Sequence, residues 1–394
     1  MPRIIFHIDV NNAFLSWTAV KLLKEGYKTD IRTIPSVIGG DESTRHGIVL
    51  AKSPVAKKMG IKTATTLYSA RKICPSLKVF PPNYSYYEEM SSKMIKLIEN
   101  YSPTLEQFSI DECFVDFTGT SYLYDDYIKL AYKIKDEIYE KLGFTVNIGV
   151  ANNKLCAKMA SDFEKPNKVH TLFEDEIEEK MWPLPVDDLF MVGKKTSEKL
   201  HSLGIHKIGD ILKHDEEFYI REFKSQGKYI YESAQGIDDS EVDNTISKSK
   251  SISVSWTLEK DTDDIDKIKN VLLKQADEVG RSLRRENMYA KRIAVTIKNK
   301  EFKSYSKQTT LNSSISSNED IYMNAILLLE KTWDFEKIRN IGIRLSGLSE
   351  NPIDQNSLFE DGSKENKEKI QKAVDKIKDK YGSKIINPAS LLNK

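Results

Sequence analysis

Acidic residues in two distant parts of the chain have the types and settings that metal-dependent phosphoryl chemistry needs. Asp9 follows the apolar run 4–8, which predicts a buried strand that ends at an acid. Asp111 and Glu112 lie about one hundred residues later, at the expected turn of a strand-turn-strand segment over 105–117. Carboxylates are hard oxygen ligands, and two-metal phosphoryl transfer needs them close together, around cations ~3.5–4 Å apart. This chemistry is therefore one interpretation of the three acids.

A structural role is the alternative interpretation. Adjacent acids on a regular strand would point to opposite faces of the sheet, so Asp111 and Glu112 act together only if a turn or bulge lies there. Asp is also common as a turn or capping residue. From the pattern alone, the structural interpretation is the stronger of the two.

Other metal-ligand types are poorly placed in this sequence. The three cysteines, Cys74, Cys113 and Cys156, lie far apart, and the six histidines form no His-x3-His pair. Such spacing predicts neither a disulfide framework nor a zinc site. Any bound metal must be held by carboxylates, which favours magnesium or manganese over zinc.

The bulk composition is that of an ordinary globular protein. The chain has 394 residues, 39% of them hydrophobic and 30% charged, which suits two to four modules. No apolar run approaches the ~20 residues of a membrane span. The first six residues are too short for a signal peptide before His7 and Asp9 interrupt them. We therefore predict a cytoplasmic protein with no membrane partner.

Strands and helices interchange around the acids. A helix is expected from about Phe14 to Leu23, and the polar segment around Gly47 contains turns. Further elements are expected as strands at 48–50 and 146–150 and as helices at 85–100, 125–141 and 154–163. Acids at strand ends within such an alternation predict an α+β sheet of the palm type. Residues 183–240 are predicted to be helical, with short loops punctuated by glycine.

Basic residues gather in one later segment although the net charge is only +1. Between residues 291 and 307, Glu301 alone opposes six cations: Lys291, Arg292, Lys298, Lys300, Lys303 and Lys307. Such a stripe binds phosphates in some nearly neutral proteins and is a solvated face in others, and charge alone does not separate the two. The alternation of Ile293, Val295 and Ile297 with polar residues predicts a strand with one buried face.

Three segments resemble the motifs of Y-family DNA polymerases. Residues 7–14 (HIDVNNAF) resemble the first motif, and residues 109–114 (SIDECF) are similar to the second catalytic motif. Residues 152–162 (NNKLCAKMASD), with 165–167 (KPN), resemble the third. The three occur in the family's order, and the resemblance covers at least residues 4–350. It implies a bacterial translesion polymerase of the UmuC and DinB type.

The resemblance also implies an active site. Asp9, Asp111 and Glu112 would be catalytic ligands of two Mg²⁺ ions, or Mn²⁺, and the backbone carbonyl of Val10 would complete a site. Phe14 would be the steric gate that excludes the 2′-OH of a ribonucleotide; without the motif it would be interpreted as a helix core residue. The reaction would be template-directed transfer of dNMP from a dNTP to a primer 3′-OH, in low-fidelity bypass of damaged DNA during an SOS-type response.

Contacts to the triphosphate are implied with some departures. Lys165 would act as a mobile point charge. Lys57 aligns with an arginine of the family, so it keeps the charge but loses the bidentate fork. Pro54 falls where the family often has a tyrosine, and Ser53 or Arg45 are the candidates to replace it.

Two departures lie in the first motif. Ala13 replaces the usual aromatic residue before the gate, which predicts a roomier floor of the nucleotide pocket. Asn11 is closer to the UmuC-type version of the motif than to the Asp-Met-Asp version found elsewhere in the family.

A right-hand α+β multidomain fold follows from the resemblance. Its parts would be a palm at 1–20 and 81–168, small fingers at 21–80, a helical thumb at 169–240, an α+β little finger at 245–350, and a tail at 351–394 with a clamp-binding peptide and a C-terminal helix.

Two modules would hold primer-template DNA. Residues 189–205 resemble a helix-hairpin-helix in the thumb, although a plain helical hairpin is an alternative. Gly193 would admit a phosphate to backbone N–H groups beside Lys194 and Lys195, and such contacts hold DNA without reading its sequence. In the little finger, the candidates for phosphate contact are Arg292, Lys298 and Lys303.

The tail carries a further motif. Residues 355–359 (QNSLF) resemble the pentapeptide that binds the bacterial sliding clamp, the β subunit, with Gln355 as an anchor and Leu358 and Phe359 as an apolar plug. The following segment predicts a last helix with Ile370, Val374, Ile377 and Tyr381 at helical spacing, packed on its own domain or on an unknown partner. A monomer is expected.

Two further hypotheses compete with an active polymerase. The first is a non-catalytic DNA-binding scaffold of the same fold. A missing carboxylate would favour it, but Asp9, Asp111 and Glu112 are all present. A nucleotidyl cyclase would also need a palm, but it has no use for a helix-hairpin-helix or a clamp peptide.

Overall fold

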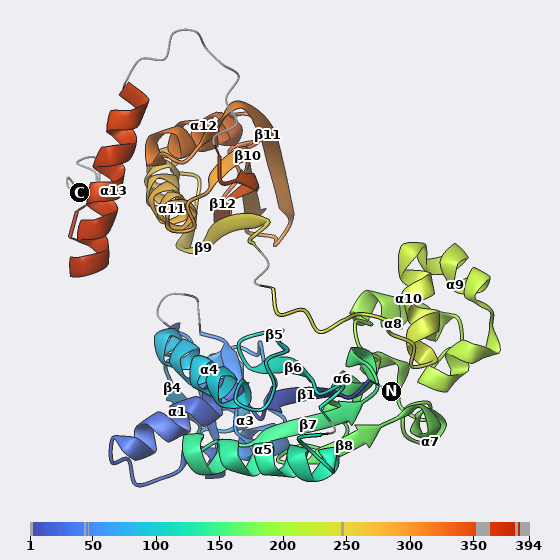
Figure 1. Cartoon of the computed structure of the whole chain (residues 1–394). Coiled ribbons are helices and arrows are strands. Elements are labelled where there is room, and N and C mark those ends of the chain that lie inside the picture. Colours follow the sequence, from blue (N-terminus) through green and yellow to red (C-terminus); the bar gives the residue numbers. More distant parts are fainter. Residues whose placement is uncertain are drawn as a thin grey trace. The chain divides into compact units, whose positions relative to one another are not determined.

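The computed structural model describes residues 3–42, 45, 47–120, 122–245, 248–351, 363–382 and 385–386, without the side chains of 363–369. The chain divides into two compact units, Met1–Ile246 and Ser247–Lys394 (Figure 1). Within the described ranges, no helix has the length and apolar character that crossing a bilayer requires.

A five-stranded sheet is the centre of the first unit. Its order is β5 (Leu105–Gln107), β6 (Glu112–Asp116), β1 (Ile5–Val10), β7 (Val146–Ala151) and β8 (Val169–Leu172). The central strand β1 pairs antiparallel with β6 and β7, and β7 pairs parallel with β8. Both faces of β1 are covered, which explains its nearly continuous apolar run. The predicted α+β class is confirmed.

Helices cover this sheet on both sides (Figure 1). On one face, Phe6 and Ile8 of β1 pack with α1 (Ala13–Lys24), α4 (Tyr84–Ile98) and α5 (Tyr127–Leu142). On the other face, Ile5 packs with α6 (Lys154–Asp162). Gly149 of β7 lets α6 come close, since a Cβ there would lie 2.0 Å from the Ala157 carbonyl oxygen.

A smaller three-stranded sheet has its own core. Its order is β3 (Val49–Lys52), β2 (Ser36–Gly39) and β4 (Lys78–Phe80), and it packs with α2 (Pro54–Lys58) and α3 (Leu67–Ile73). Pro54 occupies the first turn of α2, where its missing N–H costs nothing. Ser53 caps the same helix and accepts a hydrogen bond from the Ala56 N–H.

Short helices follow β8, as predicted for residues 183–240. They include α7 (Ile177–Lys180), α8 (Lys194–Ser202), α9 (Glu216–Phe223) and α10 (Ser225–Ala234). Their apolar residues join the core on the α6 side of the five-stranded sheet. Gly227 allows tight packing of α9 and α10, because a Cβ there would lie 2.1 Å from the Tyr219 carbonyl oxygen.

The second unit contains an antiparallel four-stranded sheet. Its order is β11 (Ser304–Ile315), β10 (Tyr289–Asn299), β12 (Ile338–Ser349) and β9 (Ser251–Thr262). Side chains of one face pack on α11 (Ile265–Arg285) and α12 (Asn318–Glu330). The predicted alternation is confirmed, since Ile293, Val295 and Ile297 are buried whereas Arg292 and Thr296 are exposed.

A last helix, α13 (Ser363–Tyr381), also forms as predicted, but its packing differs from the apolar pattern. Ile370 and Tyr381 are 64% and 62% exposed. The helix instead contacts α11 through charge: Arg284 donates to both oxygens of Asp375 at 2.7 and 3.0 Å, and Lys378 donates to Asp277 at 2.7 Å. Residues 355–359, the predicted clamp peptide, lie outside the described residues.

Candidate active site

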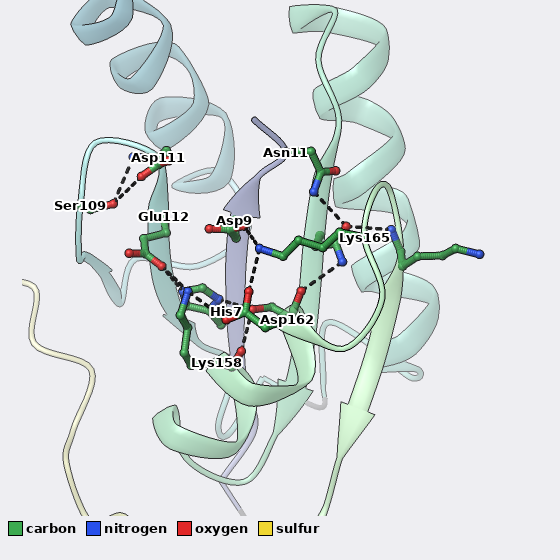
Figure 2. Close-up of polar contacts among 12 residues, drawn as sticks. His7, Asp9, Asn11, Ser109, Asp111, Glu112, Lys158, Asp162 and Lys165 are labelled. Carbon is green, nitrogen blue, oxygen red and sulfur yellow. Dashed lines mark hydrogen bonds and ion pairs between the residues drawn. The ribbon is translucent and has the colours of Figure 1, made fainter. Parts of the chain in front are cut away.

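The three predicted acids meet at one end of the β1–β6 pair (Figure 2). Asp9 and Glu112 are direct partners in the antiparallel register. Asp111 lies in the turn that precedes β6, and its carbonyl accepts a hydrogen bond from the Val10 N–H at 3.0 Å. The turn removes the strand alternation that would have separated Asp111 from Glu112, as the sequence required.

Glu112 is held by two donors that share one of its oxygens. His7 Nε2 lies 3.0 Å from Oε2, and Lys158 Nζ donates to the same atom at 2.7 Å. Burial opposes ionisation of Glu112, but these hydrogen bonds and the charge of Lys158 prevail and lower its pKa to about 2. At His7, burial outweighs the hydrogen bond to Glu112, so the pKa of the imidazole is lowered. Glu112 is therefore a carboxylate beside a buried imidazole.

Asp9 is paired with Lys165, the residue predicted to reach the triphosphate. Lys165 Nζ contacts Asp9 Oδ2 and also lies 2.7 Å from Asp162 Oδ1 (Figure 2). Burial works against the ammonium charge, but the two carboxylates outweigh it and raise the pKa of Lys165. Through this contact, Lys165 of the third motif lies beside Asp9 of the first motif.

Asp111 has no such cation beside it among the described residues. Its hydrogen bond comes from Ser109 Oγ–H at 2.7 Å. Burial is the main cause that raises the pKa of Asp111, and the neighbouring carboxylates of Asp9 and Glu112 add to it. Three carboxylates thus lie close enough for their charges to repel, which is a setting that a cation would relieve.

The donor set suits hard divalent cations. The described residues contain no group of three or more His, Cys, Asp or Glu already arranged around a metal position. Lysine ammonium groups instead neutralise Asp9 and Glu112. The predicted ligands are carboxylates, which are the preferred partners of Mg²⁺ and Mn²⁺, and the unbalanced charge at Asp111 fits a cation there.

Phe14 forms part of an aromatic group beside this site. It lies in the first turn of α1, half-buried, with its ring stacked on Tyr87 at a centroid distance of 4.6 Å and an interplanar angle of 9°. Tyr84 approaches it edge-on at 6.1 Å, and Tyr87 Oη lies 2.8 Å from Thr18 Oγ1. Sequence reasoning missed Tyr84 and Tyr87, and the aromatic start of α4 was the available indication.

The candidates for triphosphate contact occupy different settings. Lys57 is exposed on α2, near Lys52, and burial together with Lys57 lowers the pKa of Lys52. Lys52 was not predicted. Ser53 is fully buried and donates to the Ile34 carbonyl oxygen at 2.7 Å besides capping α2, so its hydroxyl has a structural role. Arg45 is exposed, with a left-handed backbone at φ 61°.

Asn11 also has a structural role. Its amide donates to Asn147 Oδ1 at 3.1 Å, and its own Oδ1 accepts the Asn167 N–H at 2.9 Å. The side chain is buried and fixes the turn that carries Lys165. This explains an amide at a position where the other version of the motif has an acid.

The predicted helix-hairpin-helix segment presents an open helix start. Gly193 is the N-cap of α8, and a Cβ added there would meet nothing within 4 Å. Lys194 and Lys195 are exposed in the first turn. Backbone N–H groups at such a start are suited to a phosphate.

Among the described residues of the second unit, helices pack on one face of the sheet and leave the other face open. Arg292 and Lys298 lie on this face, whereas Lys303 lies in the β10–β11 turn and pairs with Glu301 at 3.2 Å. Arg344 of β12, which sequence reasoning missed, is exposed on the open face between the buried Ile343 and Leu345. Its cross-strand neighbours are small: Ala294 and Ser253.

Comparisons with known proteins agree over nearly the whole chain. The impB/mucB/samB family model matches residues 8–162, that of the family's C-terminal domain matches 249–358, and the IMS family HHH motif matches 174–205. DNA polymerase IV of Clostridium acetobutylicum is 44% identical over 394 residues, covering 100% of this chain and 99% of the relative. DNA polymerase IV 1 of Bacillus subtilis is 34% identical over 395 residues, covering 100% and 94%.

A solved structure extends the match to the fold. A Y-family DNA polymerase chimera of Dbh and Dpo4 is similar with a TM-score of 0.76 and 27% identity, covering 88% of this chain and 100% of the chimera. The chain belongs to the impB/mucB/samB family of Y-family DNA polymerases. The predicted helix-hairpin-helix and C-terminal domain of this Y-family member are confirmed. Although Asn11 resembles the UmuC-type motif, the relatives reported above are named DNA polymerase IV.

Proposed function

We infer that this Y-family member is a DNA-directed DNA polymerase for translesion synthesis. It binds primer-template DNA and a dNTP and transfers dNMP to the primer 3′-OH, in the bypass of damaged DNA. The observation that carries this function is the meeting of Asp9, Asp111 and Glu112 at one end of the β1–β6 pair, in a chain that the family models match along most of its length.

The carboxylates are the proposed metal ligands. Asp9, Asp111 and Glu112, with the backbone carbonyl of Val10, would hold two divalent cations, Mg²⁺ or Mn²⁺. When bound, such cations lower the pKa of the 3′-OH and neutralise the departing pyrophosphate. The family implies the dependence on divalent metal, and the all-oxygen donor set supports the choice of ion.

Lysines of the chain would handle the triphosphate. Lys165 now bridges Asp9 and Asp162 at the mouth of the site, and its flexible stem lets the ammonium follow a more strongly charged partner. A triphosphate would compete for it, which frees Asp9 for metal. Lys57, next to Lys52, would supply positive charge from α2, with Arg45 as a further contact.

Phe14 would form the floor beneath the sugar. Its ring is held against Tyr87 and cannot move away without breaking the stack. A 2′-OH would therefore clash with the ring, and ribonucleotides would be rejected. Ala13, buried with 6% exposure, adds no second ring to this floor.

DNA would be held by two sequence-independent surfaces. The start of α8 at Gly193, Lys194 and Lys195 offers backbone N–H groups and charge to one phosphate group. The open face of the four-stranded sheet offers Arg292, Lys298 and Arg344, and Lys303 extends it at the turn. Both surfaces make contacts to phosphate that position DNA without specifying bases.

Residues 355–359 are proposed to bind the sliding clamp. The polymerase itself is proposed to be a cytoplasmic monomer. Replacing Leu358 and Phe359 by Ala should abolish binding to the purified clamp while primer extension without clamp is unchanged. Equal clamp binding by the variant and the wild type would contradict this role.

Primer extension tests the catalytic function. With Mg²⁺ and each dNTP, the wild type should extend a primer on an undamaged template, and Asp111→Ala should not, although both bind the DNA. Lesion-containing templates come next. DNA binding without extension by the wild type would favour the scaffold hypothesis, and equal extension by both proteins would exclude the proposed metal ligands.

A further inference from the structure

A buried histidine connects a proposed metal ligand to the helix α6 that covers the same face of the sheet. His7 is 0% exposed, and so is Ser161 of α6, whose Oγ lies 2.7 Å from His7 Nδ1. The other ring nitrogen faces Glu112 Oε2 at 3.0 Å (Figure 2). One side chain thus spans the distance between a helix and a catalytic carboxylate.

Packing fixes the position of the imidazole ring. His7 is the register partner of Phe114 on one side and of Gly149 on the other. The Phe114 ring lies 4.7 Å away between centroids, and the bare backbone of Gly149 brings α6 close enough for Ser161 to reach Nδ1. The ring is therefore enclosed by β6, β7 and α6.

The hydrogen bonds of the His7 ring determine which of its nitrogen atoms carries a hydrogen toward Glu112. Glu112 is a carboxylate, so His7 Nε2 must carry a hydrogen to bond it. With a neutral ring, Nδ1 then accepts from Ser161 Oγ–H. With a charged ring, Nδ1–H donates to Ser161 Oγ, whose hydrogen turns to the Lys158 carbonyl oxygen 2.8 Å away. The hydroxyl serves both states, and in both Nε2–H points at Glu112.

The two donors to Glu112 converge on one oxygen. Lys158 Nζ and His7 Nε2–H both reach Oε2, and no donor from the described residues is recorded at Oε1. Lys158 has a flexible stem and also contacts Asp162 at 3.4 Å, whereas the enclosed His7 ring has one orientation. Of these two donors, His7 has the fixed position, so it sets the rotation of the carboxylate and leaves Oε1 for a cation.

We propose that His7, oriented by Ser161, is a positioning residue that holds Glu112 for metal binding in the nucleotidyl transfer reaction. The inference rests on the proposed function. Partners that orient a metal ligand in this way typically contribute about 10–100-fold to metal affinity or activity. The role is separate from charge, because it needs an N–H donor at a fixed position.

Two substitutions at His7 separate positioning from packing. His7→Leu fills similar space without a donor, and we expect kcat to fall about 10–100-fold with the KM for dNTP unchanged. His7→Gln retains an N–H donor on a side chain of similar reach, and it should recover at least tenfold of that loss. Ser161→Ala should lower kcat less, and it should add nothing to His7→Leu because both act through one hydrogen-bond chain. Ser233→Ala, at a buried serine of α10, is the matched control and should leave kcat unchanged.

Metal binding supplies a readout that does not depend on turnover. Mn²⁺ titrated into each variant bound to primer-template DNA, followed by electron paramagnetic resonance, should give about 10–100-fold weaker binding for His7→Leu and near wild-type binding for His7→Gln. Circular dichroism melting corrects for the folded fraction. Wild-type kcat and Mn²⁺ affinity in folded His7→Leu, or a His7→Gln no better than His7→Leu, would overturn the proposal. If the wild type itself fails to extend primers, the proposed function fails, and the Mn²⁺ titration still decides the role of His7.

Discussion

The two large sheets of this protein carry charge in opposite ways. In the five-stranded sheet, acids and lysines gather at one end of β1 and β6, where Asp9 and Glu112 are 13% and 15% exposed and each is bonded to a cation. In the four-stranded sheet, Arg292 and Arg344 are exposed on an open face of small residues. One sheet concentrates charge, and the other spreads it.

The difference follows from what each surface is proposed to bind. Cations and reacting atoms must be held in fixed geometry, which requires buried side chains oriented by neighbours, as at Glu112. A DNA backbone repeats its phosphates, so many weak and separate contacts suffice. Small residues such as Gly342, where a Cβ would lie 2.6 Å from Ser255 Cβ, keep the open face flat. Substitutions should therefore have steep effects at the first surface and graded effects at the second.

The largest effect is expected at Asp9. Asp9→Asn preserves shape but removes a ligand charge, so kcat should fall on the order of a thousandfold, equivalent to about 4 kcal/mol. Single-turnover incorporation measures it, and DNA affinity should be unchanged. Asp116→Asn, at the far end of β6, is the matched control. A loss of activity equal in both variants would mean that the effect is structural.

Removal of divalent metal should separate the two surfaces without any substitution. Chelation by EDTA should abolish primer extension, because Asp9, Asp111 and Glu112 then hold no divalent cation to lower the pKa of the 3′-OH. Binding to primer-template DNA, measured by fluorescence anisotropy at constant ionic strength, should persist. Loss of DNA binding on chelation would show that the metal also organises the DNA surface.

An intermediate effect is expected at Phe14. Phe14→Ala removes the ring that stacks on Tyr87, so the preference for dNTP over rNTP should fall on the order of 100-fold while dNTP incorporation changes little. Ratios of kcat/KM for matched dCTP and CTP measure it. Phe80→Ala, which removes an aromatic ring of the three-stranded sheet from the apolar cluster that Phe14 also contacts, serves as the control. Unchanged sugar selection would contradict the gate.

The smallest effects are expected on the open face. Arg344→Ala and Arg292→Ala should each weaken DNA binding and lower the slope of log affinity against log salt by about 1, regardless of DNA sequence. Their effects should add, since the contacts are separate. Arg285→Ala, on α11 at the helical side of the sheet, is the control. A single variant that abolished binding would break the contrast between the two sheets.

Local patterns predicted most of the framework. The apolar run before Asp9 gives β1, the turn before Glu112 lies between β5 and β6, and alternation around Ile293 gives β10. These features depend on residues that are close in the sequence, so they can be predicted without a structure. The role of the three acids as metal ligands was predicted only from the resemblance to family motifs.

Contacts between distant residues could not be predicted in this way. His7 and Ser161 are separated by 154 residues, and no local pattern relates them. Arg344 lies outside the basic stripe and joins it only through strand pairing with Ala294. The apolar spacing of α13 indicated a packed face, but buried ion pairs such as Arg284–Asp375 hold the helix instead. Burial of charge depends on partners that only the fold supplies.

The most direct test of the central claim is to locate the metal ions themselves. Crystals of the protein with primer-template DNA, a non-hydrolysable dNTP analogue and Mn²⁺ would be measured at the manganese absorption edge. The account predicts two anomalous peaks in contact with Asp9, Asp111 and Glu112, with Lys165 moved from Asp9 to the triphosphate. Peaks elsewhere, or none at these carboxylates with the nucleotide bound, would contradict it.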